Sequence, residues 1–430
     1  MPDTNAGPLE IDCDVLVVGG GPAGSTAAAL LTERGWRVVL VEKDKHPRFH
    51  IGESLLPLNL GLLEKLGILK EIERIGMPKY GAEFISPEHD GTVTYDFANG
   101  WSKEFTHAYQ VRRSVFDDIL LRNAARKGAA VIEECLVEAV AFPDEGGVVA
   151  EGRDRAGKGY RWRARFLVDA SGRETLLAGK LGLKRRNRKH SSAAIFGHFA
   201  NAERLPGKAQ GNISIFWFDH GWFWFIPLSD GTTSVGAVCW PAYMKTRRTD
   251  LTSFFHDTIA KCPAIAARLR NAQLTAEVTA TGNYSYRATR MTGERYILVG
   301  DAFAFIDPVF STGVYLAMNS AFHGAEAVDT CLREPKRAAA ALRRFETSVR
   351  RGIDTFSWYI YRATAPAFRR MFMAPNNKFR VVEAQVSLLA GDVFGESPIG
   401  PRLVFFKIVY YLTSLFMLKT SVRTWRARGG

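Results

Sequence analysis

The chain has 430 residues, 47% hydrophobic and 23% charged, with a formal net charge of +13. This length and composition predict a folded protein of two or three domains and exclude a disordered or low-complexity chain. The start, MPDTNAGPLE, lacks the basic and apolar regions of a secretory signal. The five cysteines are scattered singly, without the spacing of a disulfide framework or a zinc site. We therefore expect a cytoplasmic protein.

The first strongly patterned segment is DVLVVGGGPAGSTAAALLTERGWRVVLVEK, residues 14–43. Two apolar runs around a glycine cluster and an alanine-rich helical pattern predict a strand, turn, helix and strand within a parallel sheet. Gly19, Gly21 and Gly24 form GxGxxG at the turn, and Glu42 ends the second strand. These glycines permit a tight turn, close approach of a pyrophosphate and tight helix packing, while the carboxylate can bind ribose hydroxyls. The segment predicts a dinucleotide site, and Glu42 disfavours a ribose 2′-phosphate.

Later segments predict two further regions. Alternating aromatic and polar residues near 90–101 and over 190–240 indicate antiparallel strands. Residues 296–328 indicate a strand, a loop and a helix, and the pattern after residue 336 is mainly helical. We expect an α/β fold with the following parts: a discontinuous Rossmann-like nucleotide-binding domain (1–75, 105–180 and 280–335), an antiparallel-sheet substrate domain (76–104 and 181–279), and a helical C-terminal region (336–430).

Four motifs together resemble the glutathione-reductase-type FAD fold of flavin monooxygenases and their relatives: GGGPAGSTAA, QVRRSVFDDILL, LVDASGR and ILVGDAFAFIDP. The resemblance spans about residues 12–330 and implies FAD as the cofactor. It implies that Gln110 and Arg113 flank the pyrophosphate and the isoalloxazine side, and that Asp301 binds the ribitol. A carboxylate between a strand and a helix suits sugar hydroxyls, although an ordinary helix cap also explains Asp301. Asp169 fits a structural turn better than a cofactor ligand.

The chain contains a single GxGxxG string. An enzyme with its own NAD(P)H domain normally shows a second one. Electrons are therefore expected either from transiently docked NAD(P)H or from a separate flavin reductase, and we expect reduced FAD from the reductase.

The stretch GWFWFIPL places Trp222, Trp224 and Ile226 on one face of a strand and Phe223 and Phe225 on the other. Burial of both faces in ordinary core explains this pattern. The same residues also match the WxWxIP string of flavin-dependent halogenases. That resemblance implies a wall that keeps the organic substrate away from the flavin.

A second stretch, FIDPVFSTG, matches the FxxPxxSxG pattern of the same family. The resemblance implies a halide ion held near Ser311, Thr312 and Gly313. Successive amides in such a turn at a helix start can bind an anion, although a simple capping turn is the alternative.

A lysine follows the segment IGESLLP by about two dozen residues, as it does in halogenases, and this lysine is Lys79. In an apolar tunnel its pKa would move toward neutrality. The resemblance implies that Lys79 donates a hydrogen bond to hypohalous acid or forms a haloamine with it. A lone lysine is otherwise most often a surface residue.

Taken together, the resemblance implies an FAD-dependent halogenase that makes hypohalous acid from reduced FAD, O₂ and halide and halogenates an electron-rich aromatic ring. Phe310 stands where the tryptophan-specific branch carries a glutamate. The chain therefore resembles the phenolic, pyrrole and carrier-bound branch, with a free or acyl-carrier-protein-bound aromatic substrate. The alternatives are a flavin monooxygenase or prenyl-chain reductase of the same fold, and a catalytically idle flavoprotein.

Basic residues gather in two runs, from Lys180 to His190 and from Lys419 to Arg428. Such runs are usually solvated faces, but an acidic carrier protein or peripheral contact of the C-terminus with an anionic membrane also fits. Nucleic acid is not expected, because no binding motif accompanies the charge. The apolar stretch from Leu403 to Leu418, interrupted by Lys407, predicts a helix docked on the protein rather than on a membrane surface. His46 and His50 lack further ligands, so no metal site is expected.

Overall fold

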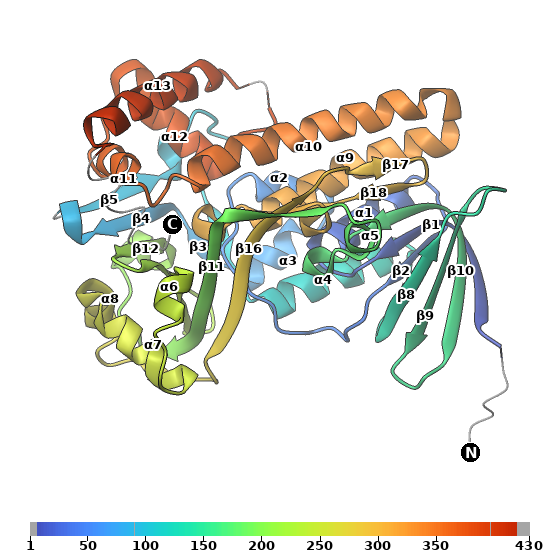
Figure 1. Cartoon of the computed structure of the whole chain (residues 1–430), viewed down its shortest axis with the longest axis horizontal. Coiled ribbons are helices and arrows are strands. Elements are labelled where there is room, and N and C mark those ends of the chain that lie inside the picture. Colours follow the sequence, from blue (N-terminus) through green and yellow to red (C-terminus); the bar gives the residue numbers. More distant parts are fainter. Residues whose placement is uncertain (1–6, 90, 396, 419–430) are drawn as a thin grey trace.

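Two β-sheets lie side by side in the computed structural model, with long helices across one edge and a group of short helices at one end (Figure 1). The structure describes residues 7–89, 91–395 and 397–418, and within these ranges it leaves the side chains of residues 188, 189, 283 and 284 undescribed. This arrangement confirms the expected α/β fold.

The first sheet has eight strands and a parallel centre in the order β18, β10, β1, β2 and β7. Its central strand β1 is apolar from Val15 to Val18 and fully buried there, as a strand covered on both faces requires. The strands are β1 (Leu9–Val18), β2 (Val38–Val41), β7 (Ala130–Ile132), β8 (Cys135–Ala141), β9 (Val148–Asp154), β10 (Gly159–Asp169), β17 (Thr292–Gly293) and β18 (Tyr296–Leu298).

Helices pack on this sheet and on one another. Helix α1 contacts both α4 and α9, and α9 also packs along α10. In Figure 1, α9 and α10 run across the upper side of the molecule, and α1 and α4 lie below them. Their bounds, with those of the shorter α2, α3 and α5, are α1 (Pro22–Glu33), α2 (Asn59–Lys65), α3 (Leu69–Ile75), α4 (Arg113–Arg126), α5 (Leu176–Lys180), α9 (Gly313–Arg333) and α10 (Ala338–Ile360).

The second sheet has nine strands, in the order β19, β16, β11, β14, β13, β12, β4 and β5, with β15 beside β11. Its neighbours are antiparallel except for β12 and β4, which run parallel because they come from distant parts of the chain. Strands β16 and β19 follow residue 278, so part of this sheet comes from the segment expected in the nucleotide domain. The strands are β4 (Gly81–Ser86), β5 (Gly91–Asp96), β11 (Lys184–Ala200), β12 (Ile213–Phe218), β13 (Gly221–Pro227), β14 (Thr233–Cys239), β15 (Gln273–Leu274), β16 (Thr279–Ala288) and β19 (Ala304–Phe305).

The two faces of β13 enter different cores, as the alternation predicts. Trp222, Trp224 and Ile226 belong to the large core shared with the first sheet. Phe223 and Phe225 belong to a smaller core on the opposite face, which includes Phe254, Phe255 and other residues of the helices below the sheet in Figure 1. These helices are α6 (Pro241–Met244), α7 (Leu251–Ala260) and α8 (Pro263–Arg268).

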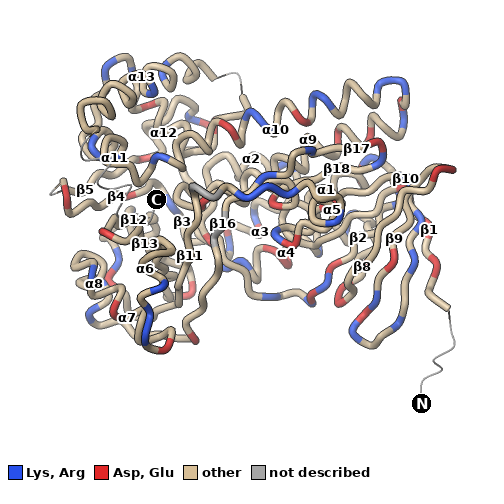
Figure 2. Tube along the Cα trace, viewed as in Figure 1, with Lys and Arg blue, Asp and Glu red and all other residues tan. Residues whose placement is uncertain are grey.

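Three helices complete the C-terminal region: α11 (Pro366–Met373), α12 (Val381–Ala390) and α13 (Gly400–Phe416). Helix α11 contacts β4 and β5, and the Tyr95 hydroxyl donates a hydrogen bond of 2.7 Å to the carbonyl of Phe372. No described helix is long and apolar enough to span a bilayer. Figure 2 shows a continuous basic stretch at the start of β11, which is the described part of the first predicted basic run. The second run lies outside the described residues.

Candidate functional site

A cavity of about 650 Å³ lies between the two sheets and is the size of a cofactor cleft. Both halves of the molecule line it: the glycine loop and the end of β2 on one side, and β13 on the other. Nine of the residues predicted for the site are on its wall: Gly19, Gly21, Glu42, Arg113, Trp222, Trp224, Asp301, Ser311 and Gly313.

Each glycine of the GxGxxG loop meets a different steric demand. Gly19 has φ +106°, and a Cβ there would lie 2.3 Å from the carbonyl oxygen of Ala170. A Cβ on Gly24 would lie 1.8 Å from the carbonyl oxygen of Gly19, so this residue permits close packing of α1 on the loop. A Cβ on Gly21 would approach only the Arg48 guanidinium, at 3.8 Å, because this glycine faces the cavity. The loop therefore leaves open space where a pyrophosphate needs to approach.

The start of α1 is free to bind an anion. Its N-cap is Gly21, which offers no side-chain cap, so the first amides of the helix keep no intrahelical partner. Glu42 lies beside this loop, and its two carboxylate oxygens accept hydrogen bonds from the amides of Gly20, at 2.6 Å, and Asp44, at 2.9 Å. The carboxylate is thus fixed at the end of β2 and lines the cavity. This donor and acceptor set fits a dinucleotide.

Arg113 is held at the cavity wall by a buried ion pair. Its guanidinium donates to both carboxylate oxygens of Asp117, at 2.8 and 2.9 Å, and Arg48 approaches the same carboxylate at 3.4 Å. Burial raises the pKa of Asp117, but the arginines outweigh it and leave the pKa below its usual value. Arg113 also lowers the pKa of His50. The cavity wall therefore carries two arginines here, and both pair with the buried Asp117 carboxylate.

Asp301 follows β18 and lines the cavity. The cap position of its short helix is Val299, so the alternative that Asp301 serves as an N-cap does not hold. Burial raises the pKa of Asp301 to about 6, against the opposing effect of Arg173 and Arg113. Asp169 differs: it accepts hydrogen bonds from the amides of Ser171 and Leu177, as a structural turn residue does.

Gln110 is not on the cavity wall. Its side chain is fully buried in β6 (Ala108–Gln110), and its amide nitrogen donates to the carbonyl of Gly211 at 3.1 Å. Its buried Oε1 has no hydrogen-bond partner among the described residues, and its backbone pairs with Ser54, which does line the cavity. The position of Gln110 beside the cofactor stays a prediction.

The tryptophans of β13 form one wall of the cavity. Trp222 and Trp224 are 2% and 6% exposed, and their rings lie 6.1 Å apart. Trp224 donates from Nε1 to the Ser234 hydroxyl at 3.1 Å, and a Cβ on Gly236 would lie 2.2 Å from its ring. The indole therefore rests directly on the backbone of β14, which fixes its position.

The loop before α9 has the backbone of an anion-binding nest. Ser311 has left-handed dihedral angles, φ 58° and ψ 27°, and Thr312 follows with φ −81° and ψ −15°. Such alternation turns successive amides toward one point. Thr312 is the N-cap of α9 but makes no side-chain cap, and its buried hydroxyl has no hydrogen-bond partner among the described residues. Ser311 and Gly313 line the cavity, so a small anion here would lie at its edge.

Lys79 ends β3 (Met77–Lys79) and lies directly behind the cavity wall. It is 1% exposed, and its Nζ donates to the Ser54 hydroxyl at 3.0 Å and to the Leu55 carbonyl at 2.6 Å. Ser54 itself lines the cavity. The ammonium also lies 5.2 Å from the ring centre of Phe97. Burial lowers the pKa of Lys79 to about 7, so the alternative of a surface lysine does not hold.

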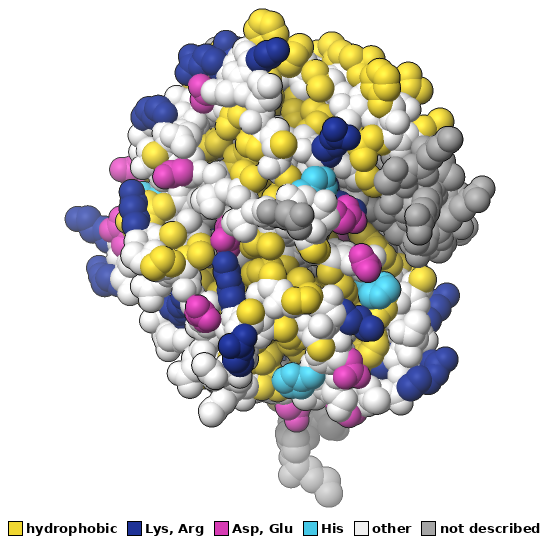
Figure 3. Space-filling view, turned by 90° about the vertical axis from the view of Figure 1, so that its left-hand side faces the viewer, with side chains coloured by type: hydrophobic (Ala, Val, Ile, Leu, Met, Phe, Trp, Pro, Cys, Tyr) yellow, Lys and Arg dark blue, Asp and Glu magenta, His cyan; other side chains and the backbone are white. Residues whose placement is uncertain are grey.

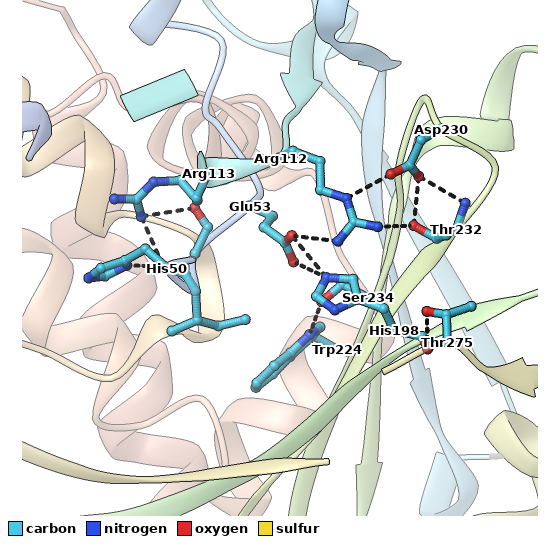
Figure 4. A network of polar contacts seen from close by, with 12 residues as sticks. His50, Glu53, Arg112, Arg113, His198, Trp224, Asp230, Thr232, Ser234 and Thr275 are labelled. Atoms are coloured by element: carbon cyan, nitrogen blue, oxygen red, sulfur yellow. Dashed lines mark hydrogen bonds and ion pairs between the residues drawn. The ribbon is translucent and has the colours of Figure 1, made fainter. Parts of the chain in front are cut away.

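A polar network that the sequence analysis missed lies next to Trp224 and reaches the cavity wall at Glu53 (Figure 4). Glu53 is 1% exposed and accepts from His198 Nε2, with distances of 3.0 and 3.2 Å to its two oxygens. Arg112 approaches Glu53 at 3.9 Å and donates to Asp230 at 2.7 Å. Glu53 and Arg112 come from the nucleotide-binding side, whereas His198 and Asp230 come from the second sheet, so the network joins the two halves.

The sequence carries a signal for only some of the site residues that the sequence analysis did not name. Asp117 follows Arg113 by four residues on a helix, a spacing that predicts an ion pair. Glu53 stands inside the segment that located Lys79, but 145 residues separate it from His198, and no local pattern connects them. His46 and His50 lie on the same loop, and among the described residues no group of three His, Cys, Asp or Glu side chains is placed to hold a metal ion.

Comparisons with known proteins agree with this site. The sequence family described as "FAD binding domain" matches residues 12–347. The flavin-dependent halogenase armH3 of Armillaria mellea is 36% identical over 352 residues, which are 76% of this chain and 69% of that protein. A 1H-pyrrole-2-carbonyl-(peptidyl-carrier protein) chlorinase of Pseudomonas fluorescens is 29% identical over 91% of both chains. The solved structure of the myxobacterial chondrochloren halogenase is 35% identical, with a TM-score of 0.77, and covers 95% of this chain and 97% of that chain.

Proposed function

The chain belongs to the flavin-dependent halogenases, and from that premise we propose that Lys79 directs hypohalous acid, made from halide, dioxygen and reduced FAD, onto an electron-rich aromatic ring. The observation that carries this proposal is a buried lysine whose hydrogen-bond partners among the described residues are neutral oxygens, one of them on Ser54 of the cavity wall. A lysine in ordinary core would be paired with a carboxylate, because an unpaired buried charge is costly.

The residues on the wall fit FAD. The glycine loop and the start of α1 would take the pyrophosphate, Glu42 the ribose and Asp301 the ribitol hydroxyls, while Arg113 adds positive charge beside the phosphates. Bound reduced FAD supplies the two electrons for the overall reaction, in which reduced FAD, O₂, halide and one proton give FAD, hypohalous acid and water. Trp222 and Trp224 exclude the organic substrate from the cavity in which this occurs.

The nest before α9 would hold the halide. The amides around Thr312 and Gly313 and the unpartnered Thr312 hydroxyl offer donors to an anion at the cavity edge. A positive helix end favours negative charge at this point. These donors would keep the halide beside the cofactor without a cationic side chain that could itself be halogenated.

Lys79 would act on the oxidant by proximity and as a hydrogen-bond donor. With a pKa of about 7, its Nζ can carry the proton or release it near neutral pH. The protonated form polarises the hydroxyl of hypohalous acid. Substitution on the ring then replaces one ring proton by halogen and releases water.

We propose an aromatic substrate with an apolar body, either free or bound to a carrier protein. Phe310 is 4% exposed and packs on Phe372 and Phe84, with ring centres 6.2 and 6.4 Å away. This environment offers no carboxylate at residue 310 for the ammonium of a free amino acid. The pyrrole-loaded carrier protein named for the Pseudomonas chlorinase, which aligns with 91% of this chain, is the model for a tethered substrate.

We also propose that a separate flavin reductase supplies reduced FAD. The support is the single GxGxxG loop of the sequence, which lies between β1 and α1 and serves one dinucleotide. NADH added without a reductase should then leave the bound flavin oxidised under anaerobic conditions. A catalytic amount of the reductase should reduce the flavin and bleach its visible absorbance.

For location, we propose the cytoplasm, with peripheral contact of the basic C-terminus on an anionic membrane surface. The supports are the free state of all five cysteines, four of them buried, and the basic tail of the sequence.

The decisive experiment compares the wild type with Lys79→Met. Each protein, loaded with FAD, receives a flavin reductase, NADH, O₂ and bromide, together with a phenol, a pyrrole or a pyrrole-loaded carrier protein. Monochlorodimedone in parallel reactions traps free hypohalous acid. We expect Lys79→Met to keep halide-dependent trapping and to lose the halogenated aromatic product, while Lys261→Met, an exposed lysine on the second sheet's helical side, keeps both. Oxygenated or reduced product without halide would instead indicate a monooxygenase or a reductase, and absence of flavin turnover an idle flavoprotein.

A further inference from the structure

Helix α13 docks on the protein through one face only. Leu403, Phe406 and Tyr410 are its buried residues. Phe406 stacks on Tyr359 of α10, with ring centres 5.6 Å apart, and also meets Phe368 of α11 at 5.7 Å. The helix therefore has a fixed orientation relative to the rest of the C-terminal region, so its opposite face is fixed as well.

That opposite face is apolar and open to solvent. Residues spaced four, three and four apart lie on one stripe of a helix, and here they are Val404, Ile408, Tyr411 and Leu415. They are 53, 53, 54 and 67% exposed. Tyr411 lies at the edge of the stripe, where its hydroxyl accepts hydrogen bonds of 3.2 Å from Trp358 and Arg362. Leu412, Phe416 and Leu418 widen the stripe, with Phe416 89% exposed. Figure 3 shows the end of the molecule that carries α13, and hydrophobic side chains gather along its upper part.

An exposed aromatic residue of a neighbouring segment extends the apolar surface of α13. Phe379, on the segment before α12, is 70% exposed and contacts Phe405 of α13 edge to face, with ring centres 5.0 Å apart. Single exposed apolar residues are normal on a protein surface, but a contiguous patch of this kind marks an interaction site.

The sequence of this region is basic. From Ser397 to the C-terminus it has no Asp or Glu, and its basic residues are Arg402, Lys407, Lys419, Arg423, Arg426 and Arg428, the last four outside the described residues. Lys378 and Arg380 flank Phe379 on the neighbouring segment, where Arg380 is paired with Glu383. A second copy of the chain related by a two-fold axis would bring the same cations against one another. An anionic surface, in contrast, is complementary to them.

The helix suits the interface of a bilayer rather than its interior. It has 17 residues and Lys407 near its middle, which is short of the roughly 20 apolar residues of a spanning segment. An apolar stripe beside basic residues is the pattern of a helix that lies in the headgroup region.

We propose that α13 lies flat on an anionic lipid surface, with Val404, Ile408, Leu412 and Leu415 inserted among the acyl chains and the surrounding cations on the headgroups. This inference deepens the peripheral contact proposed above by naming the inserted face, and it is independent of the halogenation reaction. The enzyme would thereby work on a membrane-associated supply of substrate, which suits apolar aromatic compounds.

The test uses the full chain and vesicles of phosphatidylcholine, with or without about 30% phosphatidylglycerol. The double variant Ile408→Ser/Leu415→Ser should bind the anionic vesicles at least about tenfold more weakly than the wild type, because two large aliphatic side chains are lost. The matched control Leu9→Ser/Leu181→Ser removes two exposed leucines elsewhere, 44 and 45% exposed, and should bind like the wild type. Both should fold, since all four positions are open to solvent.

Two further measurements separate insertion from simple charge attraction. An environment-sensitive fluorophore on Ile408→Cys should shift to shorter wavelength on anionic vesicles, whereas the same label on Leu181→Cys should not. If Arg423→Gln/Arg426→Gln/Arg428→Gln abolishes binding while the label at 408 never shifts, the tail alone makes the contact and the inserted face is wrong. If light scattering shows a dimer of the wild type that the double variant dissociates, a second copy of the chain covers this face and the lipid proposal is wrong. If no variant differs from the wild type in vesicle binding, membrane contact itself is wrong.

Discussion

Lys79 and Ser54 connect the wall of the flavin cavity with the space behind it. The Lys79 ammonium donates a hydrogen bond of 3.0 Å to the Ser54 hydroxyl, and Ser54 is one of the residues that line the cavity. The second acceptor is the Leu55 carbonyl, and no ion pair found among the described residues includes Lys79. The charge of this lysine is therefore stabilised by neutral oxygens and one aromatic ring alone.

The first prediction concerns the stability cost of Lys79. Its pKa is 10.5 in the unfolded chain and about 7 in the folded protein, so between these values only the unfolded state holds the proton. The free energy of unfolding should rise as pH increases from about 7 to 10.5 and should be flat below 7. Lys79→Met should remove this rise and should be more stable at pH 7 by up to about 5 kcal/mol.

Denaturant unfolding at several pH values checks this, with Lys261→Met as the control for loss of an exposed lysine. The difference between the wild type and each variant isolates the lysine from other titrating groups. Equal pH dependence of the wild type and Lys79→Met would show that Lys79 is not desolvated in the folded protein.

The second prediction concerns Asp301. Burial holds its pKa near 6, above the usual 3.8. The folded state therefore binds the proton more tightly, and the free energy of unfolding contributed by this group falls as pH rises from 3.8 to 6. Asp301→Asn should stabilise the protein without FAD at pH 7 by roughly 1 to 3 kcal/mol, yet bind FAD about tenfold or more weakly because the acceptor for the ribitol is lost.

Thermal unfolding of the apoprotein and titration of FAD by its fluorescence measure the two effects separately. Asp12→Asn, on the exposed part of β1, serves as control and should change neither. A variant that loses stability without FAD would show that Asp301 has a structural partner.

The third prediction concerns the contact of Gly236 with Trp224. Because a Cβ on Gly236 would come within 2.2 Å of the indole, Gly236→Ala should displace Trp224 and cost about 1 to 3 kcal/mol. The displaced ring would also open the wall, so less halogenated product should form per NADH consumed. Gly159→Ala is the control, since it lies in a strand where the added Cβ meets Pro8 at an ordinary 3.5 Å.

Product yield per NADH and the midpoint of denaturant unfolding give the two readouts. Loss of stability with an unchanged yield would mean that Trp224 supports the fold and has no part in separating the substrate from the flavin.

The fourth prediction concerns His198 and Glu53. His198→Ala leaves the buried Glu53 carboxylate with only Arg112, at 3.9 Å. A buried charge without its hydrogen-bond donor should cost roughly 2 to 4 kcal/mol, and FAD should bind more weakly because Glu53 lines the cavity. His256→Ala, an exposed histidine on α7, should have little effect in the same unfolding and FAD titrations. A double-mutant cycle with Glu53→Gln should recover much of the loss, since it removes the stranded charge.

Features that depend on backbone geometry were predictable from the sequence. The glycine loop is one, because the 1.8 Å approach of a Cβ on Gly24 excludes every other residue. The two faces of β13 are another, because side chains alternate in any strand. The parallel alignment of β1 with β2 also followed from the strand, turn, helix and strand pattern, and the structure confirms it.

Features that depend on contacts between segments distant in the sequence could not be predicted from local patterns. Burial of Lys79 was expected only through the family resemblance and its spacing from the segment that contains Ser54, whereas its contact with Phe97 has no sequence signal. The hydrogen bond of Gln110 to the carbonyl of Gly211 also has no local signal. The Glu53 and His198 pair and the parallel pairing of β12 with β4 likewise arise only when the two halves of the molecule meet.

The even-numbered and odd-numbered residues of β13 face different surroundings. Trp222, Trp224 and Ile226 line the cavity, whereas Phe223 and Phe225 belong to a core that does not reach it. We expect substitutions at the first three positions to change how well the flavin is separated from the organic substrate, and substitutions at the other two to change the stability of the sheet. Alternate positions of one seven-residue strand can therefore change independently during evolution.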